Sequence, residues 1–94
     1  MTNFVIKKSG EREPFDPMKI ENSIRAAATD AGLPTERINE LVNRVAKVVI
    51  DAVVDKNEVA TSEIKKRILA ELDEIEPAVA DAWRQFDEAK ENQK

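Results

Sequence analysis

Two short stretches of this 94-residue chain carry lysines at a spacing that could bind the phosphates of an anion. Lys7 and Lys8 stand just before a Ser9-Gly10 turn, and Lys19 lies in the first turn of the helix that Asp16-Pro17 predicts. A lysine ammonium neutralises phosphate as a point charge. Because alternation along a strand puts Lys7 and Lys8 on opposite faces, the pair could instead be a solvated edge that discourages aggregation.

The second stretch holds Thr61, Lys65 and Lys66. The Thr61 hydroxyl could donate to a phosphate or sugar oxygen, and Lys65 follows one helical turn later on the same face. The residues alone favour another interpretation, in which Thr61 only caps a helix and the lysines form ordinary surface ion pairs with glutamates. The glutamates in question are Glu63, Glu71 and Glu74.

The residue types exclude much chemistry. Without cysteine or histidine there is no thiol nucleophile, no thiolate zinc site and no histidine base, and no glycine-rich phosphate loop is present. We therefore expect a protein that binds rather than catalyses. No apolar run suits a signal peptide or a membrane span, so the simplest expectation is a cytoplasmic protein with no membrane partner.

The charge distribution bears on the partner. The net charge is -4 and the pI is near 4.9, which argues against nucleic acid because a duplex would be repelled. Residues 1–25 carry five basic and four acidic side chains, whereas residues 26–94 carry ten basic and fifteen acidic ones. A locally basic segment on an acidic body suits a small polyanion better than a long one. Nucleic acid is therefore expected to be an unlikely partner.

A small β cap and four helices would position the lysines. Residues 3–15 predict a hairpin with Pro14 on an edge strand, and residues 58–60 predict a brief third strand. Helices are expected at about 17–31, 35–54, 62–75 and 77–88, with Asp16, Thr35 and either Thr61 or Ser62 as caps of the first three. The predicted fold class is α+β and predominantly helical: a four-helix bundle under a β-hairpin or three-stranded sheet, in a single domain over residues 1–94.

Apolar residues at helical spacing predict the core. The second helix has the strongest period and is expected to be the most buried. Trp83 and Phe86 are expected to pack inward from the last helix, with stacking on a base as the sharper alternative, and residues 87–94 to fray. The positions expected to face inward from these two helices are Ile38, Leu41, Val42, Val45, Val48, Val49, Ala52, Val79, Ala82, Trp83 and Phe86.

The run from Val5 to Ile20, VIKKSGEREPFDPMKI, resembles the opening signature of the ATP-cone domain, V-x-K-R-D-G-x-x-E-x-F-D-x-x-K-I. The later E-V-A-T-S-E-I and A-x-x-W-x-x-F are similar to further blocks of that family. The resemblance implies an allosteric module, found at the N-terminus of many ribonucleotide reductase large subunits and in the repressor of their genes. It also implies ATP or dATP, as the magnesium complex, held between the cap and the helices.

The resemblance also implies roles for individual residues. Val5 and Ile20 would lie against the base, Lys19 would face phosphate, and Lys7 would contact phosphate or base. Glu13 or Asp16 could read the hydroxyl that distinguishes ATP from dATP. The nucleotide-binding residues expected on this basis are Val5, Lys7, Lys8, Glu13, Asp16, Lys19, Ile20, Thr61 and Lys65.

Two departures keep alternatives open. Ser9 stands where the signature has aspartate, and Lys8 stands where it usually has arginine, which loses the planar fork. The chain could thus be an interaction or oligomerisation module with a degenerate site, or, less in keeping with its acidic body, a repressor contacting DNA through Lys65, Lys66 and Arg67. As a cone without cysteines it is expected to be free-standing or excised from a longer chain, acting on a protein partner or through self-association.

Overall fold

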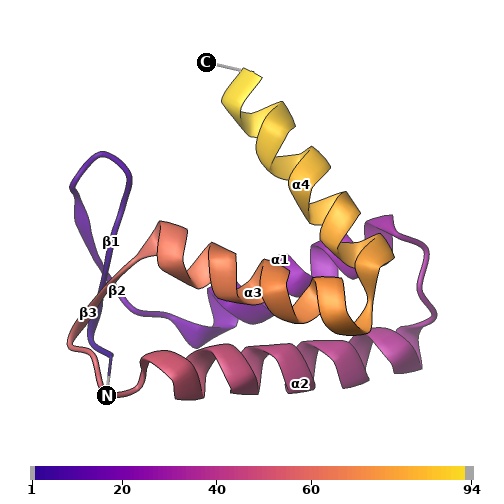
Figure 1. Ribbon diagram of the computed structural model, residues 1–94, viewed down its shortest axis with the longest axis horizontal. Coiled ribbons are helices and arrows are strands. Elements are labelled where there is room, and N and C mark those ends of the chain that lie inside the picture. Colours follow the sequence, from indigo (N-terminus) through magenta and orange to yellow (C-terminus); the bar gives the residue numbers. More distant parts are fainter. Residues whose placement is uncertain (1, 93–94) are drawn as a thin grey trace.

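The computed structural model describes residues 2–92, with side chains described as far as Phe86. Within this range three short strands form one sheet: β1 (Phe4–Ile6), β2 (Arg12–Pro14) and β3 (Glu58–Ala60). The helices are α1 (Pro17–Asp30), α2 (Thr35–Val53), α3 (Thr61–Ile75) and α4 (Pro77–Asn92). The sheet lies at one end of the helical body, and α4 leaves that body at a steep angle (Figure 1). The predicted fold class is confirmed.

The sheet joins the opening hairpin to a strand that lies more than 40 positions later in the sequence. Its order is β2-β1-β3, with β1 antiparallel to β2 and parallel to β3, so that Val5 pairs with Glu13 on one side and with Val59 on the other. Gly10 completes the hairpin turn at a φ of 91°, a conformation that costs glycine little. Pro14 lies on an edge strand, as its missing amide hydrogen predicts.

An ion pair crosses the face of the sheet. Arg12 on β2 reaches Glu58 on β3, with Nη2 3.0 Å from Oε1 and Nε 3.2 Å from Oε2. Between them the guanidinium lies over the ring of Phe4 on the central strand, 4.5 Å from its centroid. This stack of a cation on an aromatic ring ties all three strands together on their exposed side.

The helices bury one aliphatic core. α2 contacts α1 and α3, and α4 contacts the same two helices from the other side. α2 buries more residues than α1 or α3, because its apolar positions form one face that both neighbours cover. The largest fully buried side chains are Ile24, Leu41, Val42, Val45, Val49, Val53, Ile68, Leu72 and Val79.

The helix starts differ from expectation at two of three caps. Asp16 caps α1 as predicted, since its Oδ1 accepts the Met18 amide hydrogen at 3.0 Å. Thr35 does not cap α2, because Pro34 already occupies the cap position in an extended conformation. Neither Thr61 nor Ser62 caps α3: β3 runs directly into the helix, so Ala60 is both the last strand residue and the cap.

Three apolar positions expected to be buried are exposed. Val48 is 41% exposed and Ala52 is also exposed, because the covered face of α2 is centred on Val45, Val49 and Val53. Phe86 is 49% exposed, since α4 at this point is already leaving the helical body (Figure 1). Val79, Ala82 and Trp83 are buried, as predicted.

The last helix is longer than expected. α4 runs to Asn92 instead of ending near residue 88, so its backbone is helical over most of the segment expected to fray. The prediction of fraying also covered residues 93 and 94, which lie outside the described residues. Among the helices of residues 2–92, none combines the length and apolar character needed to cross a bilayer.

Candidate nucleotide-binding site

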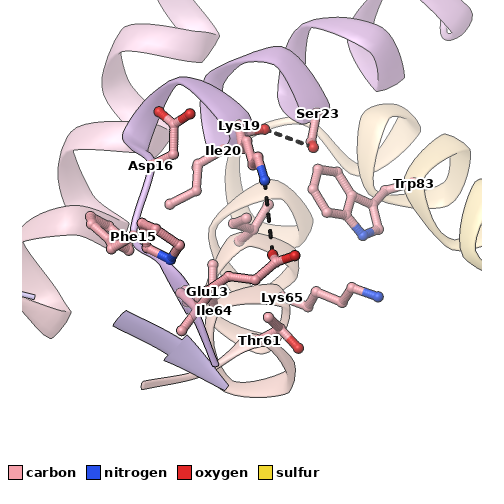
Figure 2. Close-up of a pocket in the computed structure, with 13 residues that line it drawn as sticks. Glu13, Phe15, Asp16, Lys19, Ile20, Ser23, Thr61, Ile64, Lys65 and Trp83 are labelled. Carbon is pink, nitrogen blue, oxygen red and sulfur yellow. Dashed lines mark hydrogen bonds and ion pairs between the residues drawn. The ribbon is translucent and has the colours of Figure 1, made fainter. Parts of the chain in front are cut away.

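A cavity of about 170 Å³ opens where the sheet, α1 and α3 meet. Parallel pairing of β1 with β3 brings the opening segment of the chain beside the start of α3, which lies more than 50 positions later in the sequence. Seven of the nine residues predicted from the sequence line this cavity (Figure 2). These seven are Val5, Glu13, Asp16, Lys19, Ile20, Thr61 and Lys65.

Apolar side chains form much of the cavity wall. Val5 comes from β1, Ile20 from α1, and Ile64 and Ile68 from α3. Ile20, Ile64 and Ile68 are at most 8% exposed and belong to the core, so their positions are fixed by packing. A flat apolar group could therefore enter without reorganising the helices.

Glu13 organises the charges at the sheet end of the cavity. Its Oε1 lies 3.0 Å from Lys7 Nζ, and its Oε2 lies 3.8 Å from Lys19 Nζ. The hydrogen bond from Lys7 holds the pKa of the Glu13 carboxyl below its ordinary value, and the same contact raises the pKa of Lys7. Glu13 thus stays ionised and holds two lysines that come from different elements.

Lys7 and Lys8 do not line this cavity. They line a neighbouring one of about 410 Å³, whose wall also carries Thr61, Lys65 and Lys66. Strand alternation would put Lys7 and Lys8 on opposite faces, but β1 ends at Ile6 and the chain has begun to turn by Lys8, so both residues line the same cavity. Thr61 and Lys65 belong to both cavities and form the wall between them.

Asp16 has a structural task in addition to its place on the cavity wall. Its Oδ1 accepts the Met18 amide hydrogen, and in Figure 2 its carboxylate turns back toward the first turn of α1. Glu63, considered as a partner for the α3 lysines, instead pairs with Lys56 Nζ at 3.0 Å. That contact with Lys56 holds the pKa of the Glu63 carboxyl below its ordinary value.

Several lining residues were not identified from the sequence. Ser23 lies one turn after Lys19 on α1, and its hydroxyl donates to the Lys19 carbonyl oxygen at 2.8 Å. Phe15 and Trp83 lie on opposite sides of the cavity in Figure 2. The spacing of Ser23 four residues after Lys19 could have placed it beside the site. Trp83 is predicted to pack inward, with stacking on a base as the alternative, but its place at this cavity depends on how α4 crosses α1 and α3.

The cavity pairs two kinds of surface. Ile20 and Ile64 offer an apolar wall, while Lys19, Lys65 and the Thr61 hydroxyl offer cations and a donor. A ligand that matches both kinds has a flat apolar part and a phosphorylated part, which is the chemistry of a nucleotide. Together with the adjoining lysine-rich cavity, the space falls in the range of small-molecule sites, roughly 300–1,000 Å³.

The fold and this site define a small helical domain with a cavity, partly apolar and partly lined by lysines, between a β cap and two of the helices. Residues 3–89 match the sequence family described as the ATP cone domain, so the chain belongs to that family. The family is one of nucleotide-binding regulatory domains, and it is not catalytic.

The chain is also similar to proteins named transcriptional repressor NrdR. It is 36% identical to that of Syntrophus aciditrophicus over 86 residues, covering 87% of this chain and 53% of the relative. For Streptococcus pneumoniae the identity is 34% over 94 residues, covering 96% and 59%, and for Erythrobacter litoralis it is 30% over 91 residues, covering 93% and 58%. The chain thus spans little more than half the length of these relatives.

These relatives correct one expectation. From the net charge of -4, nucleic acid was expected to be an unlikely partner. That expectation is wrong, because the relatives are named as transcriptional repressors, and a repressor acts on DNA. Net charge was a poor guide because it describes the 94 residues of this chain alone, and these span little more than half the length of the relatives.

Proposed function

We propose that this chain is a regulatory domain that binds ATP or dATP, as the magnesium complex, in the cavity between the sheet, α1 and α3. The observation that carries the proposal is the meeting of an apolar wall with Lys19, Lys65 and Thr61 in one cavity. Membership of the ATP cone family supports it. Binding would stabilise the cap on the helical body and so change the surface offered to a partner.

The adenine would lie against Val5, Ile20 and Ile64, and Glu13 or Asp16 would read the hydroxyl that distinguishes ATP from dATP. The triphosphate would run toward Lys19 and Lys65, with the Thr61 hydroxyl as a donor. Lys7 and Lys8 would act from the adjoining cavity, Lys7 through its contact with Glu13. Magnesium would be held chiefly by phosphate oxygens and water, as is usual for nucleotide complexes.

The expected affinity is in a useful range for sensing. A ligand of about 31 heavy atoms at roughly 0.3 kcal/mol per atom gives about 9 kcal/mol, which corresponds to a Kd of micromolar or somewhat below. Calorimetric titration with ATP, dATP and GTP tests the proposal. We expect saturable heat from the adenine nucleotides with one apparent Kd each and a weaker signal from GTP. A folded sample that gave no heat and no thermal shift with millimolar ATP and magnesium would refute it.

A second candidate is a helical interaction module whose nucleotide site is degenerate. Lys8 and Ser9 favour it, because both depart from the family signature in the hairpin. Nucleotide bound to the purified protein, identified by mass after denaturation, separates the two candidates. Adenine nucleotide at a stoichiometric level supports the sensor, whereas its absence together with self-association that ignores ATP supports the interaction module.

For the polypeptide that carries such a domain, we propose that the regulated activity concerns ribonucleotide reductase or the transcription of its genes. The names of the relatives favour DNA as a target. Lys7 and Lys8 at the hairpin and Lys65 and Lys66 on α3 line one cavity and offer cations to a phosphate backbone. A gel shift over a range of salt, with and without ATP, tests this: binding through phosphates weakens linearly in log salt. Binding that ignored both salt and nucleotide would contradict it.

A further inference from the structure

The indole of Trp83 presents a buried hydrogen-bond donor at the cavity. Trp83 lies on α4, is 7% exposed, and lines the same cavity as Lys19, Ser23 and Lys65. Among the residues that the structure describes, no acceptor pairs with its Nε1. In Figure 2 the ring stands at the side of the cavity opposite Phe15, and the Lys65 side chain extends toward that same side.

An indole N–H buried without a partner is costly, and a buried tryptophan normally finds an acceptor. Phenylalanine at the same position would keep most of the apolar packing and avoid that cost. The N–H is therefore expected to have an acceptor in the working state of the protein. The cavity that the indole lines is where a ligand can supply one.

We infer that Trp83 Nε1 donates a hydrogen bond to a phosphate oxygen of the bound nucleotide, an inference that rests on the proposed function. The acceptor is assigned to phosphate because Lys65 extends toward the same side of the cavity as this donor and Lys19 lines the same cavity, so the charge of the wall favours an anionic acceptor. Phe15 lies on the opposite side of the cavity in Figure 2, and Val5, against which the base is proposed to lie, comes from β1.

A rearrangement accompanies this contact. Trp83 Nε1 has almost no solvent-accessible surface, so a ligand oxygen reaches it only when a neighbouring side chain moves. Lys65 is the natural candidate, because it is a long, exposed side chain on the cavity wall. Phosphate binding would thus draw the Lys65 ammonium onto the ligand and uncover the indole N–H together.

The chain has one tryptophan, so a spectroscopic signal from indole reports this residue alone. The wild-type protein, labelled with ¹⁵N, is titrated with ATP and separately with adenosine, while calorimetry follows binding in parallel. We expect ATP to shift the indole N–H resonance downfield and slow its exchange with solvent, with the same midpoint as the heat. Adenosine, which has the base and sugar but no phosphate, should leave that resonance nearly unmoved.

Variants give an independent test. Trp83→Phe should weaken ATP binding by about threefold to tenfold, because it removes the donor. Phe86→Leu is the matched control: it changes an exposed aromatic residue one turn later on α4 and should leave the Kd unchanged. If the Trp83→Phe variant does not fold, the indole N–H resonance of the wild-type protein still tests the inference.

The outcomes separate this inference from the proposed function. Calorimetric heat from ATP with an unmoved indole resonance overturns the role of Trp83 and leaves the proposed function standing. An equal shift with adenosine overturns the assignment to phosphate. The absence of ATP heat from a folded sample overturns the proposed function, and this inference with it.

Discussion

Glu13 Oε1 lies 3.0 Å from Lys7 Nζ, so an acid on β2 holds a lysine that follows β1 across the hairpin. The second oxygen of the same carboxylate lies 3.8 Å from Lys19 on α1. One carboxylate therefore connects the sheet, the first helix and both lysine groups of the opening segment. If the proposed nucleotide binds, its phosphate would compete with Glu13 for Lys19, and binding would then be coupled to the position of the hairpin.

The contact between Glu13 and Lys7 predicts a dependence of stability on pH. The folded state lowers the pKa of Glu13, so its contribution is complete above the ordinary glutamate value of about 4.3. The contribution is lost as the pH falls below that value and through the lowered pKa. Urea unfolding between pH 3 and pH 7 should show a smaller loss at the acid end in Glu13→Gln than in the wild type.

Removal of Lys7 should restore the pKa of Glu13. In Lys7→Met the main cause of the shift is gone, so the carboxyl resonance of Glu13 should titrate closer to the ordinary value. Lys56→Met is the control, since Lys56 pairs with Glu63 and should leave Glu13 unaffected. A Glu13 titration curve that is the same in Lys7→Met and the wild type would contradict the role given to this pair.

Lys19 should carry a large share of nucleotide affinity. A charge-assisted hydrogen bond to phosphate is worth enough that Lys19→Ala should raise the Kd for ATP roughly tenfold, measured by calorimetry at fixed salt. Arg25→Ala removes an exposed cation from the same helix outside the cavity, and its Kd should stay within about twofold of the wild type. Equal losses in both variants would mean that long-range charge, and not a contact, holds the ligand.

Asp16 should affect stability through its cap and discrimination through its place in the cavity. Asp16→Ala removes the acceptor for the Met18 amide and should lower the free energy of unfolding by about 1 kcal/mol, whereas Asp16→Asn should keep most of it. If Asp16 or Glu13 contacts the 2′-hydroxyl, alanine at that position should abolish the difference between the ATP and dATP affinities. The affinity for either nucleotide should fall less than this difference does. Unchanged ratios in both variants would remove them from that role.

The core should be sensitive to loss of volume beside the site. Ile24 on α1 is fully buried, so Ile24→Ala should lower the free energy of unfolding by about 2–5 kcal/mol in chemical denaturation. Met18→Ala, at a side chain that is 63% exposed on the same helix, should change it by less than about 0.5 kcal/mol. A loss in Ile24→Ala no larger than in Met18→Ala would show that α1 is not packed as described.

Sequence reasoning reached the fold because its signals were local. The Asp16-Pro17 start, the Ser9-Gly10 turn and the period of α2 each act within a few residues. The cavity was harder to predict, because Thr61 and Lys65 reach Lys19 only through the parallel pairing of β1 with β3. Before that pairing is known, each lysine is better interpreted as a solvated surface residue that forms ordinary ion pairs.

The errors have the same origin. Thr61 was assigned a cap because a threonine before a helical period usually is one, yet here a strand occupies the position in front of it. Phe86 was assigned to the core on spacing alone, and no local rule shows that α4 leaves the body one turn after Trp83. The family resemblance includes Trp83 in its last block but gives it no place in the expected site, because its position at the cavity depends on a helix crossing.

The parallel pairing of β1 with β3 leads us to expect an order of events during folding. The β1–β2 hairpin spans only about a dozen residues, whereas β1 can meet β3 only when α1 and α2 bring position 58 back to position 4. We therefore expect the cavity wall to be completed late, and it depends on a ladder three residues long. Amide hydrogens of β3 should exchange with solvent well before those of α2, and a bound nucleotide should slow that exchange more than any other in the molecule.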